Sequence, residues 1–415
     1  MAGIAEVVGA VLGSDSGIEL KAYDGSRYGS ADAEVRLTFQ SPRALTYLAR
    51  SSPELGLARA YVTGELTIDG DLYSMLRSIE LAGLERLSAR HRLDLLSKLG
   101  PRVFGRAPVP PQEVGLSLLR RGVRHARGRD AAAIKHHYDV SNRFYSLVLG
   151  PSMAYTCAIY ANPQVSLEYA QAEKFDLVCR KLDLHPGQRL LDVGCGWGGM
   201  VVHAAKHYGV TVLGVTLSRH QAEWAQKAIA EEGLSDSAEV RHQDYRDVTE
   251  VGFDAVSSIG LTEHIGVRNY AAYFRHLSDR LRPGGRLLNH AIMRPTTTEP
   301  TIWPNGFINK YVFPDGELTG VGRVISALQD MGLEPRHSEN LREHYALTLA
   351  AWCRNLQSNW DEAVHEVGLG TARVWALYMA ACRVAFERNG IQLHQVLAVR
   401  PTNSGVAGMP LRPTW

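Results

Sequence analysis

Residues 190–199 read LLDVGCGWGG, a short apolar run that leads into a glycine-rich turn. The run Arg189–Val193 predicts a buried strand, and a helix is expected from Met200 onward. Glycines allow positive backbone φ angles and let a ligand approach the main chain closely. A strand, a glycine turn and a helix in this order predict the first unit of a nucleotide-binding α/β domain.

The alternation of strand and helix continues after this stretch. Further strands are expected at Val210–Thr216, Glu239–Gln243, Phe253–Ile259, Arg286–Met293 and Ile391–Val399, and helices at Arg219–Glu232, Leu318–Met331 and Tyr345–Glu366. The sequence RPGG at 282–285 predicts a turn before the strand 286–293. This alternation is typical of α/β folds with a largely parallel sheet.

Acidic residues near the glycine turn indicate its ligand. The turn satisfies the pattern G-x-G-x-x-G of dinucleotide sites, which alone is weak evidence. A site for NAD also needs an acid about 20 residues later, and residues 214–218 read GVTLS, without one. Asp192 at the end of the first strand and Asp244 after the third favour S-adenosylmethionine (SAM) instead.

Composition and charge exclude several classes of protein. The chain has 415 residues, with 45 Lys and Arg against 43 Asp and Glu, and this net charge of +2 argues against a nucleic-acid binder. Its five cysteines are scattered, so neither a disulfide framework nor a metal site is expected, and a reducing cytoplasm fits best. Neither a secretory signal nor a transmembrane helix is expected.

The N-terminal third contains two sections. Residues 1–84 predict a small α+β domain, with a strand at 34–39, a helix from Ser41-Pro42 and a helix at 72–84. Residues 85–133 are interpreted as a basic linker, since positions 85–137 hold twelve Lys or Arg and four acids, a net charge of +8. The segment is either a solvated linker or a surface for anionic lipids. Residues 134–415 are the expected catalytic domain.

Five further motifs lie in this catalytic part: HYDVSNRFY at 137–145, MAYTCA at 153–158, GLTEHIG at 260–266, NKYVFPDG at 309–316 and IQLHQV at 391–396. Together they resemble the motifs of the cyclopropane-fatty-acyl-phospholipid synthases and the related mycolic-acid methyltransferases. The resemblance implies a Rossmann-like SAM-dependent methyltransferase domain with a seven-stranded mixed sheet. Residues 1–84 resemble, less closely, the lipid-associated N-terminal domain of the family's phospholipid-acting members.

The resemblance also implies a reaction and the residues for it. In this family the methyl carbon of SAM is added to an unactivated cis double bond, and the resulting carbocation loses a proton to an enzyme-bound bicarbonate ion. The residues that match the bicarbonate cradle are Cys157, Gly260, Glu263, His290, Ile292 and Tyr345. Those that match the SAM site are Tyr155, Thr156, Asp192, Gly194, Cys195, Gly196, Gly198, Thr216, Leu217, Gln221, Gln243 and Asp244.

The residue types suit these roles, although each also has a purely structural interpretation. His290 and Tyr345 can donate hydrogen bonds, and Glu263 can accept the hydroxyl proton of bicarbonate. Taken singly, His290 could be a core histidine, Tyr345 could cap a helix and Glu263 could belong to a polar helix start. Cys157 could be a small buried apolar residue. Cys382 is expected to be structural, because alkene methylation needs no covalent enzyme intermediate.

Four aromatic residues form a second candidate feature on a segment expected to be a helical lid: Trp303, Phe307, Tyr311 and Phe313. They either pack in the core or line a tunnel for the acyl chain. In a tunnel, their ring faces would also stabilise a transient cation.

The substrate and partners follow from the resemblance alone. It implies an unsaturated fatty acyl phospholipid as the substrate of a cytoplasmic enzyme, peripheral at the inner face of the membrane. The product is either a cyclopropane or a methylene- or methyl-branched chain, and a methyl branch would need a separate reductase. A homodimer stays open. The alternative functions are a SAM-dependent N- or O-methyltransferase of a small molecule and a non-catalytic lipid-binding protein.

Overall fold

The computed structural model describes residues 3–12, 17–81, 105–114, 124–130, 141–303 and 306–415. The chain divides into two compact units. The first contains Met1–Leu116, Trp303–Pro314 and Trp360–Val384, and the second contains Ser117–Ile302, Asp315–Asn359 and Ala385–Trp415. The units are thus assembled from separate stretches of chain, whereas the domains predicted from sequence are contiguous.

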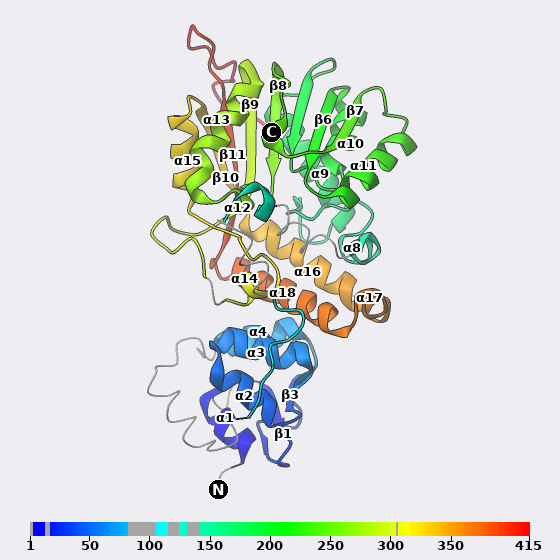
Figure 1. Cartoon of the computed structure of the whole chain (residues 1–415), viewed down its shortest axis with the longest axis vertical. Coiled ribbons are helices and arrows are strands. Elements are labelled where there is room, and N and C mark those ends of the chain that lie inside the picture. The colour runs from blue at the N-terminus through cyan, green and yellow to red at the C-terminus, as the bar shows by residue number, and fades with distance from the viewer. Residues whose placement is uncertain (1–2, 13–16, 82–104, 115–123, 131–140, 304–305) are drawn as a thin grey trace. The chain divides into compact units, whose positions relative to one another are not determined.

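The second unit is built on the expected seven-stranded mixed sheet (Figure 1). Its strands, in the order β10-β11-β9-β8-β5-β6-β7, are β5 (Arg189–Val193), β6 (Thr211–Thr216), β7 (Ala238–His242), β8 (Phe253–Ile259), β9 (Leu281–Met293), β10 (Glu334–Asn340) and β11 (Gln392–Val399). The five strands β5 to β9 are parallel to their neighbours among themselves. β11 pairs antiparallel with both β9 and β10.

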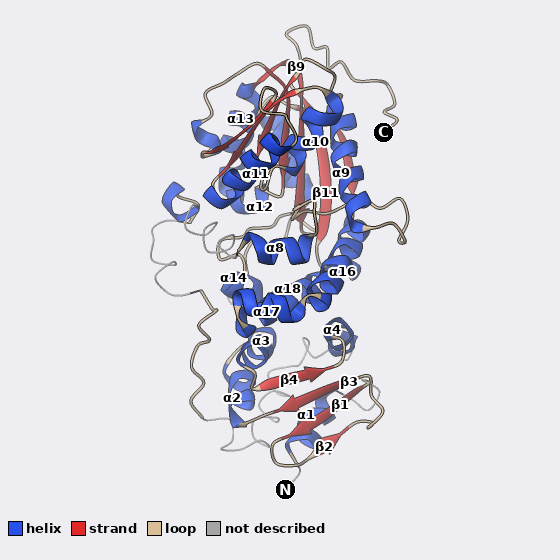
Figure 2. Ribbon diagram, turned by 90° about the vertical axis from the view of Figure 1, so that its right-hand side faces the viewer, coloured by secondary structure: helices blue, strands red, loops and turns tan. Residues whose placement is uncertain are grey.

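Helices cover both faces of this sheet (Figure 2). One face packs against α9 (Leu167–Leu182), α10 (Gly199–Tyr208) and α11 (Arg219–Glu231), and the other against α13 (Tyr270–Arg280) and α15 (Val321–Asp330). Leu190 lies in the first core and Leu191 in the second, because side chains of a strand alternate between its faces. Burial on both faces explains why β5 reads as a continuous apolar run.

The first unit has a four-stranded sheet in the order β2-β1-β3-β4. Its elements before the second unit are α1 (Ile4–Leu12), β1 (Ile18–Ala22), β2 (Arg27–Tyr28), β3 (Val35–Phe39), α2 (Pro42–Arg50), α3 (Pro53–Thr63), β4 (Leu66–Asp69) and α4 (Leu72–Leu81). As expected, α2 begins at Pro42, and the Ser41 side chain accepts a hydrogen bond from the Arg43 N–H.

Later parts of the chain return to the first unit. They are α14 (Phe307–Tyr311), α17 (Trp360–Val367) and most of α18 (Leu369–Glu387). The Arg383 guanidinium lies 3.5 Å from the centre of the Tyr73 ring, and the Phe307 N–H donates to the Glu54 carboxylate at 3.1 Å. These long-range contacts explain why the unit is discontinuous in sequence.

Several expected elements differ in extent. Residues 282–285 lie inside β9, but the register with β8 passes from Leu281, opposite Phe253, to Arg286, opposite Ala255. Gly284 has a φ of 80°, so the chain turns here within the strand. The expected helix 345–366 is two helices, α16 (Arg342–Ser358) and α17, which meet at Asn359. Positions 85–104, 115–123 and 131–133 of the predicted linker lie outside the described residues. No described helix is both long and apolar enough to span a bilayer.

Candidate active site

A cavity lies at the carboxyl ends of β5, β6 and β8, in the second unit. β5 lies between β6 and β8, so this is the point where the strand order reverses and where open α/β sheets bind ligands. Ten of the twelve predicted SAM residues line the cavity: Tyr155, Thr156, Asp192, Gly194, Cys195, Gly196, Thr216, Leu217, Gln221 and Gln243.

The glycine turn forms one wall of the cavity. Gly194 and Gly196 have φ angles of 76° and 54°, in the left-handed region that favours glycine. The N–H groups of Gly194 and Cys195 donate to the Val215 carbonyl at 2.9 and 3.1 Å, which holds the turn against β6. A Cβ atom added at Gly196 would meet no atom within 4 Å in the part of the chain that the structure describes. The space beside Gly196 is therefore available to a ligand.

Two predicted SAM residues have other positions. Gly198 has a φ of 82°, and a Cβ atom there would lie 2.7 Å from the Ala225 Cβ, so its small size serves the packing of α10 on α11. The Asp244 carboxylate accepts hydrogen bonds from the Arg246 guanidinium at 2.7 and 2.8 Å and from the Arg246 N–H. Neither residue lines the cavity.

The polar groups of the cavity are held by short hydrogen bonds. Asp192 is buried, and its carboxylate accepts from the Ser257 hydroxyl at 2.6 Å. Burial raises the pKa of Asp192 to about 6. The Thr216 hydroxyl donates to the Gln221 side chain at 2.8 Å. The arrangement provides a carboxylate at the end of β5 and a hydroxyl–amide pair at the end of β6.

Lys174 of α9 is a cavity residue that the sequence analysis missed. Its ammonium is buried, donates to the Thr156 hydroxyl at 2.9 Å and lies 3.6 Å from the centre of the Phe175 ring. Burial lowers the pKa of Lys174 to about 7. The available signal was a set of polar residues on the apolar face of one helix, where Gln171 and Lys174 are spaced i, i+3 and Lys181 follows two turns later.

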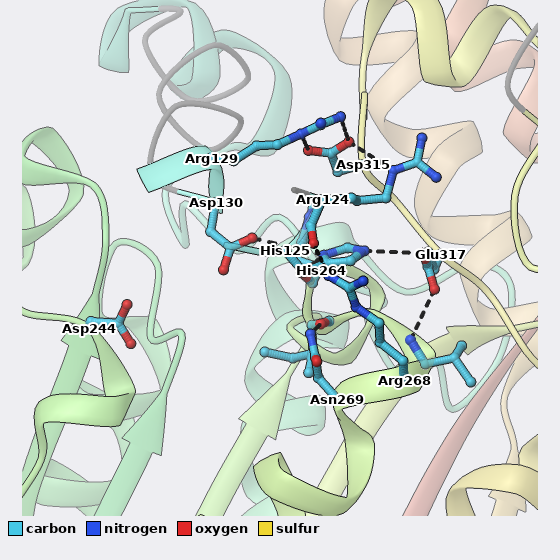
Figure 3. A network of polar contacts seen from close by, with 12 residues as sticks. Arg124, His125, Arg129, Asp130, Asp244, His264, Arg268, Asn269, Asp315 and Glu317 are labelled. Carbon is cyan, nitrogen blue, oxygen red and sulfur yellow. Dashed lines mark hydrogen bonds and ion pairs between the residues drawn. The ribbon is translucent and has the colours of Figure 1, made fainter. Parts of the chain in front are cut away.

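A network of hydrogen bonds and ion pairs connects residues 124–130 with other parts of the second unit (Figure 3). The Arg129 guanidinium donates to both carboxylate oxygens of Asp315 at 2.7 Å, and both side chains are buried. The His125 ring lies 3.1 Å from the Glu317 carboxylate and 3.0 Å from the His264 carbonyl. Basic residues assigned by sequence to a linker therefore make internal contacts.

The end of this segment reaches the cavity. Asp130 lines it and accepts a hydrogen bond from Arg246, another cavity residue, at 3.1 Å. His264, from the motif GLTEHIG, also lines the cavity. Asp130 and Arg246 were not predicted as site residues. They are 116 positions apart in the sequence, and only the fold brings them together.

The predicted bicarbonate cradle adjoins this cavity. Gly260 lines the cavity, and its N–H donates to the His290 carbonyl at 2.8 Å. Glu263 belongs to α12 (Thr262–Ile265), and its Oε1 accepts from the Ile292 N–H at 2.7 Å. Both Glu263 Oε2 and His290 Nε2 are buried and have no hydrogen-bond partner among the described residues. A buried acceptor and a buried ring nitrogen are thus left for a ligand.

The other two cradle residues lie on neighbouring elements. Cys157 is buried, and burial raises the pKa of its thiol far above the usual range, so the thiol stays protonated. The next residue, Ala158, donates its N–H to the Thr348 hydroxyl of α16 at 3.0 Å. Tyr345, on the first turn of the same helix, is buried with its ring against Phe386 at 4.5 Å between centres.

The four predicted tunnel residues all belong to the first unit. Phe307 and Tyr311 are buried with ring centres 5.2 Å apart, and Phe313 contacts Tyr378 edge to face at 5.9 Å. Trp303 is 54% exposed. Three of the four therefore contribute to packing within this unit, and a wall of an acyl tunnel stays a prediction.

We expect Glu263 to make the ligand-free protein less stable as the pH rises. Burial raises its pKa from 4.5 to about 7, so the folded protein holds this proton more tightly than the unfolded chain does. The stabilisation is complete below pH 4.5 and is lost as the pH rises to about 7, and is on the order of 3 kcal/mol. Thermal unfolding at pH 5 and pH 8 should therefore show a larger loss of stability in wild type than in Glu263→Gln. Equal losses in the two proteins would contradict the raised pKa.

The sheet order, the glycine turn and the cavity at the switch point define the class of SAM-dependent methyltransferases. The sequence matches the family model described as mycolic acid cyclopropane synthetase over residues 125–396. It is 55% identical to a Mycobacterium tuberculosis protein named "Probable fatty acid methyltransferase". The alignment extends over 405 residues, which are 96% of this chain and 94% of that protein. It is 33% identical to the Escherichia coli cyclopropane-fatty-acyl-phospholipid synthase, over 91% of each chain.

Solved structures agree with this match. A cyclopropane synthase of Mycobacterium tuberculosis has a TM-score of 0.62 at 32% identity and covers 66% of this chain and 98% of its own. A mycolic acid cyclopropane synthase solved with S-adenosylhomocysteine has a TM-score of 0.61, also at 32% identity, over 65% of this chain and 97% of its own. The chain belongs to the cyclopropane synthase family and is a SAM-dependent methyltransferase that acts on fatty acids.

Proposed function

We propose that this enzyme transfers the methyl carbon of SAM to the cis double bond of an unsaturated fatty acyl chain in a phospholipid, with an enzyme-bound bicarbonate ion as the base. The product is a cyclopropane or a methylene-branched chain, and a separate reductase would be needed for a methyl branch. The Escherichia coli relative, which matches both units, is named for a phospholipid substrate.

The observation that carries the bicarbonate proposal is a pair of buried atoms without a hydrogen-bond partner among the described residues. They belong to Glu263 and to His290, whose carbonyl accepts from the N–H of the cavity residue Gly260. Bicarbonate has oxygen atoms that accept hydrogen bonds and one hydroxyl group that donates. His290 Nε2 and Glu263 Oε2 offer the complementary donor and acceptor, and both are buried without a partner in the described structure. SAM supplies an electrophilic methyl group when bound, and bicarbonate would supply a weak base.

The chain's own residues prepare the site for this chemistry. Asp192 offers a carboxylate to the ammonium group of SAM, and the glycine turn lets the amino-acid end of the cofactor approach the main chain closely. Glu263 is held in place by the Ile292 N–H and can accept the hydroxyl proton of the anion. The buried surroundings exclude water, which would otherwise capture a carbocation.

We also propose that the enzyme works at the surface of an anionic membrane. The support is the net charge of the segment 85–137. Arg124 and Arg129 form ion pairs with Asp315, and Arg127 forms one with Asp247. These three arginines therefore add less positive charge to a membrane-facing surface than the count from the sequence implies. The remaining basic residues of the segment carry the proposal.

The experiment that tests the function is mass spectrometry of lipids after incubation of the full chain with SAM and oleoyl phospholipid vesicles. Addition of one CH₂ should raise the acyl mass by about 14 Da, and fragmentation or NMR then distinguishes a ring from a methylene branch. Free oleate in place of the vesicles tests whether the phospholipid is needed. An unchanged lipid mass, with SAM binding intact, would overturn the proposal and favour a small-molecule N- or O-methyltransferase.

A further inference from the structure

Three strands of the second unit place Glu339, Gln395 and His290 in one row across the sheet. Glu339 of β10 is paired in register with Gln395 of β11, and Gln395 is paired with His290 of β9. Directly opposite residues in antiparallel strands carry their side chains on the same face. The row therefore follows from strand register and ends at the cradle.

Lys181 of α9 lies over this row. Its side chain is fully buried, and its ammonium donates to the Glu339 carboxylate and to the Gln395 side-chain oxygen, the latter at 2.7 Å. The Gln395 side-chain nitrogen lies 3.2 Å from Nδ1 of His290. The proton positions along this chain can be deduced from the kinds of atom that meet.

An ammonium group only donates hydrogen bonds, so the Gln395 atom that faces Lys181 must be the carbonyl oxygen. The amide nitrogen then faces His290, and an amide nitrogen also only donates. His290 Nδ1 must accept this hydrogen bond and so carries no proton. In a neutral imidazole the proton then sits on Nε2.

The environment keeps the imidazole neutral. Burial lowers the pKa of His290 well below its ordinary value, and the ammonium groups of Lys174 and Lys181 lower it further. A charged imidazole would also direct an Nδ1 proton at the amide hydrogens of Gln395. Only the tautomer with the proton on Nε2 is compatible with this neighbourhood.

We propose that Gln395, itself oriented by Lys181, is a positioning residue that holds His290 in the Nε2–H tautomer, so that His290 donates a hydrogen bond to the anion in the cradle. The identity of that anion rests on the proposed function, whereas the tautomer does not. The buried Nε2 atom, which has no hydrogen-bond partner among the described residues, is the independent sign that a ligand completes this hydrogen bond.

Gln395→Glu is the substitution that separates this role from packing. The side chain keeps its size and its contact with Lys181, but a carboxylate accepts a hydrogen bond where the amide donated one. The tautomer of His290 with its proton on Nδ1 is then favoured. Nε2 becomes a hydrogen-bond acceptor and can no longer donate to the anion. Loss of a hydrogen bond to a charged group should raise the bicarbonate concentration for half-maximal turnover by about 10- to 100-fold.

The test combines spectroscopy and kinetics on the full chain at pH 8. ¹⁵N-histidine NMR, with His290 assigned by comparison with His290→Gln, should show a protonated Nε2 in wild type and a protonated Nδ1 in Gln395→Glu. SAM affinity measured by calorimetry should be the same in both. Gln392→Glu is the matched control, because Gln392 lies on the same strand and contacts another histidine, His394, at 2.8 Å. It should leave both His290 and the bicarbonate dependence unchanged.

The outcomes separate the two proposals. A protonated Nδ1 in wild type, or unchanged His290 signals in Gln395→Glu, would overturn the positioning role. Wild-type turnover that is independent of bicarbonate in CO₂-depleted buffer, with the Nε2–H tautomer intact, would overturn the bicarbonate part of the proposed function alone. Lys181→Met is a second test. It frees the Gln395 amide to rotate, so a mixture of the two His290 tautomers is expected.

Discussion

Glu263→Gln should lose most of its turnover, by about 10²- to 10³-fold, while it binds SAM as tightly as wild type. The carboxylate touches the proposed anion site through Oε2 and is absent from the wall of the cofactor cavity. The amide can still accept the Ile292 N–H at Oε1, so the local fold should persist. What is lost is the acceptor for a hydroxyl proton, since the second position becomes an NH₂ donor.

The measurement is turnover on oleoyl phospholipid vesicles together with SAM calorimetry. Glu334→Gln provides the matched control, because Glu334 is a surface residue whose side chain pairs with Arg336 of the same strand at 2.6 Å. The control should retain full turnover. A Glu263→Gln enzyme within about threefold of wild type would refute a role for Glu263 in holding the base.

Gly196→Val should abolish detectable SAM binding. An added Cβ atom meets no atom of the described residues within 4 Å, so the valine side chain would project into the space beside the glycine turn, on the wall of the cavity. A positive φ angle also strains any residue with a Cβ atom, by roughly 1–2 kcal/mol. Steric exclusion of the cofactor is thus expected in addition to a modest loss of stability.

Gly187→Val separates these two effects. Gly187 has a φ of 85°, is exposed, and likewise has open space around an added Cβ atom, but it lies outside the cavity. Both variants should show similar losses in thermal stability, and only Gly196→Val should lose its calorimetric signal with SAM. If Gly196→Val keeps wild-type affinity, the cofactor binds elsewhere.

The local elements of the second unit could be predicted closely from sequence. β5 and β8 have the expected bounds, and α11 differs by one residue, because apolar periodicity and glycine turns are short-range signals. Residues 282–285 lie inside β9 rather than before it, but they pair with neither β8 nor β11, and Gly284 has a φ of 80°, so the expected turn is present as an irregularity within the strand. The helix break at Asn359 was not predicted either. The Asn359 side chain donates a hydrogen bond to the Leu147 carbonyl, and a contact across 212 positions leaves no local pattern.

The sequence by itself determined the class of this protein. The strand, glycine turn and acidic residues of the cofactor site lie within short stretches, and several of the family's motifs are contiguous. Only the tertiary structure decided which groups meet: Lys174 with Thr156, Asp130 with Arg246, and Lys181 with His290 through Gln395. It also decided that residues 303–314 belong to the first unit. Such pairings depend on strand register and on helix packing across gaps of up to 214 residues, which local periodicity does not encode.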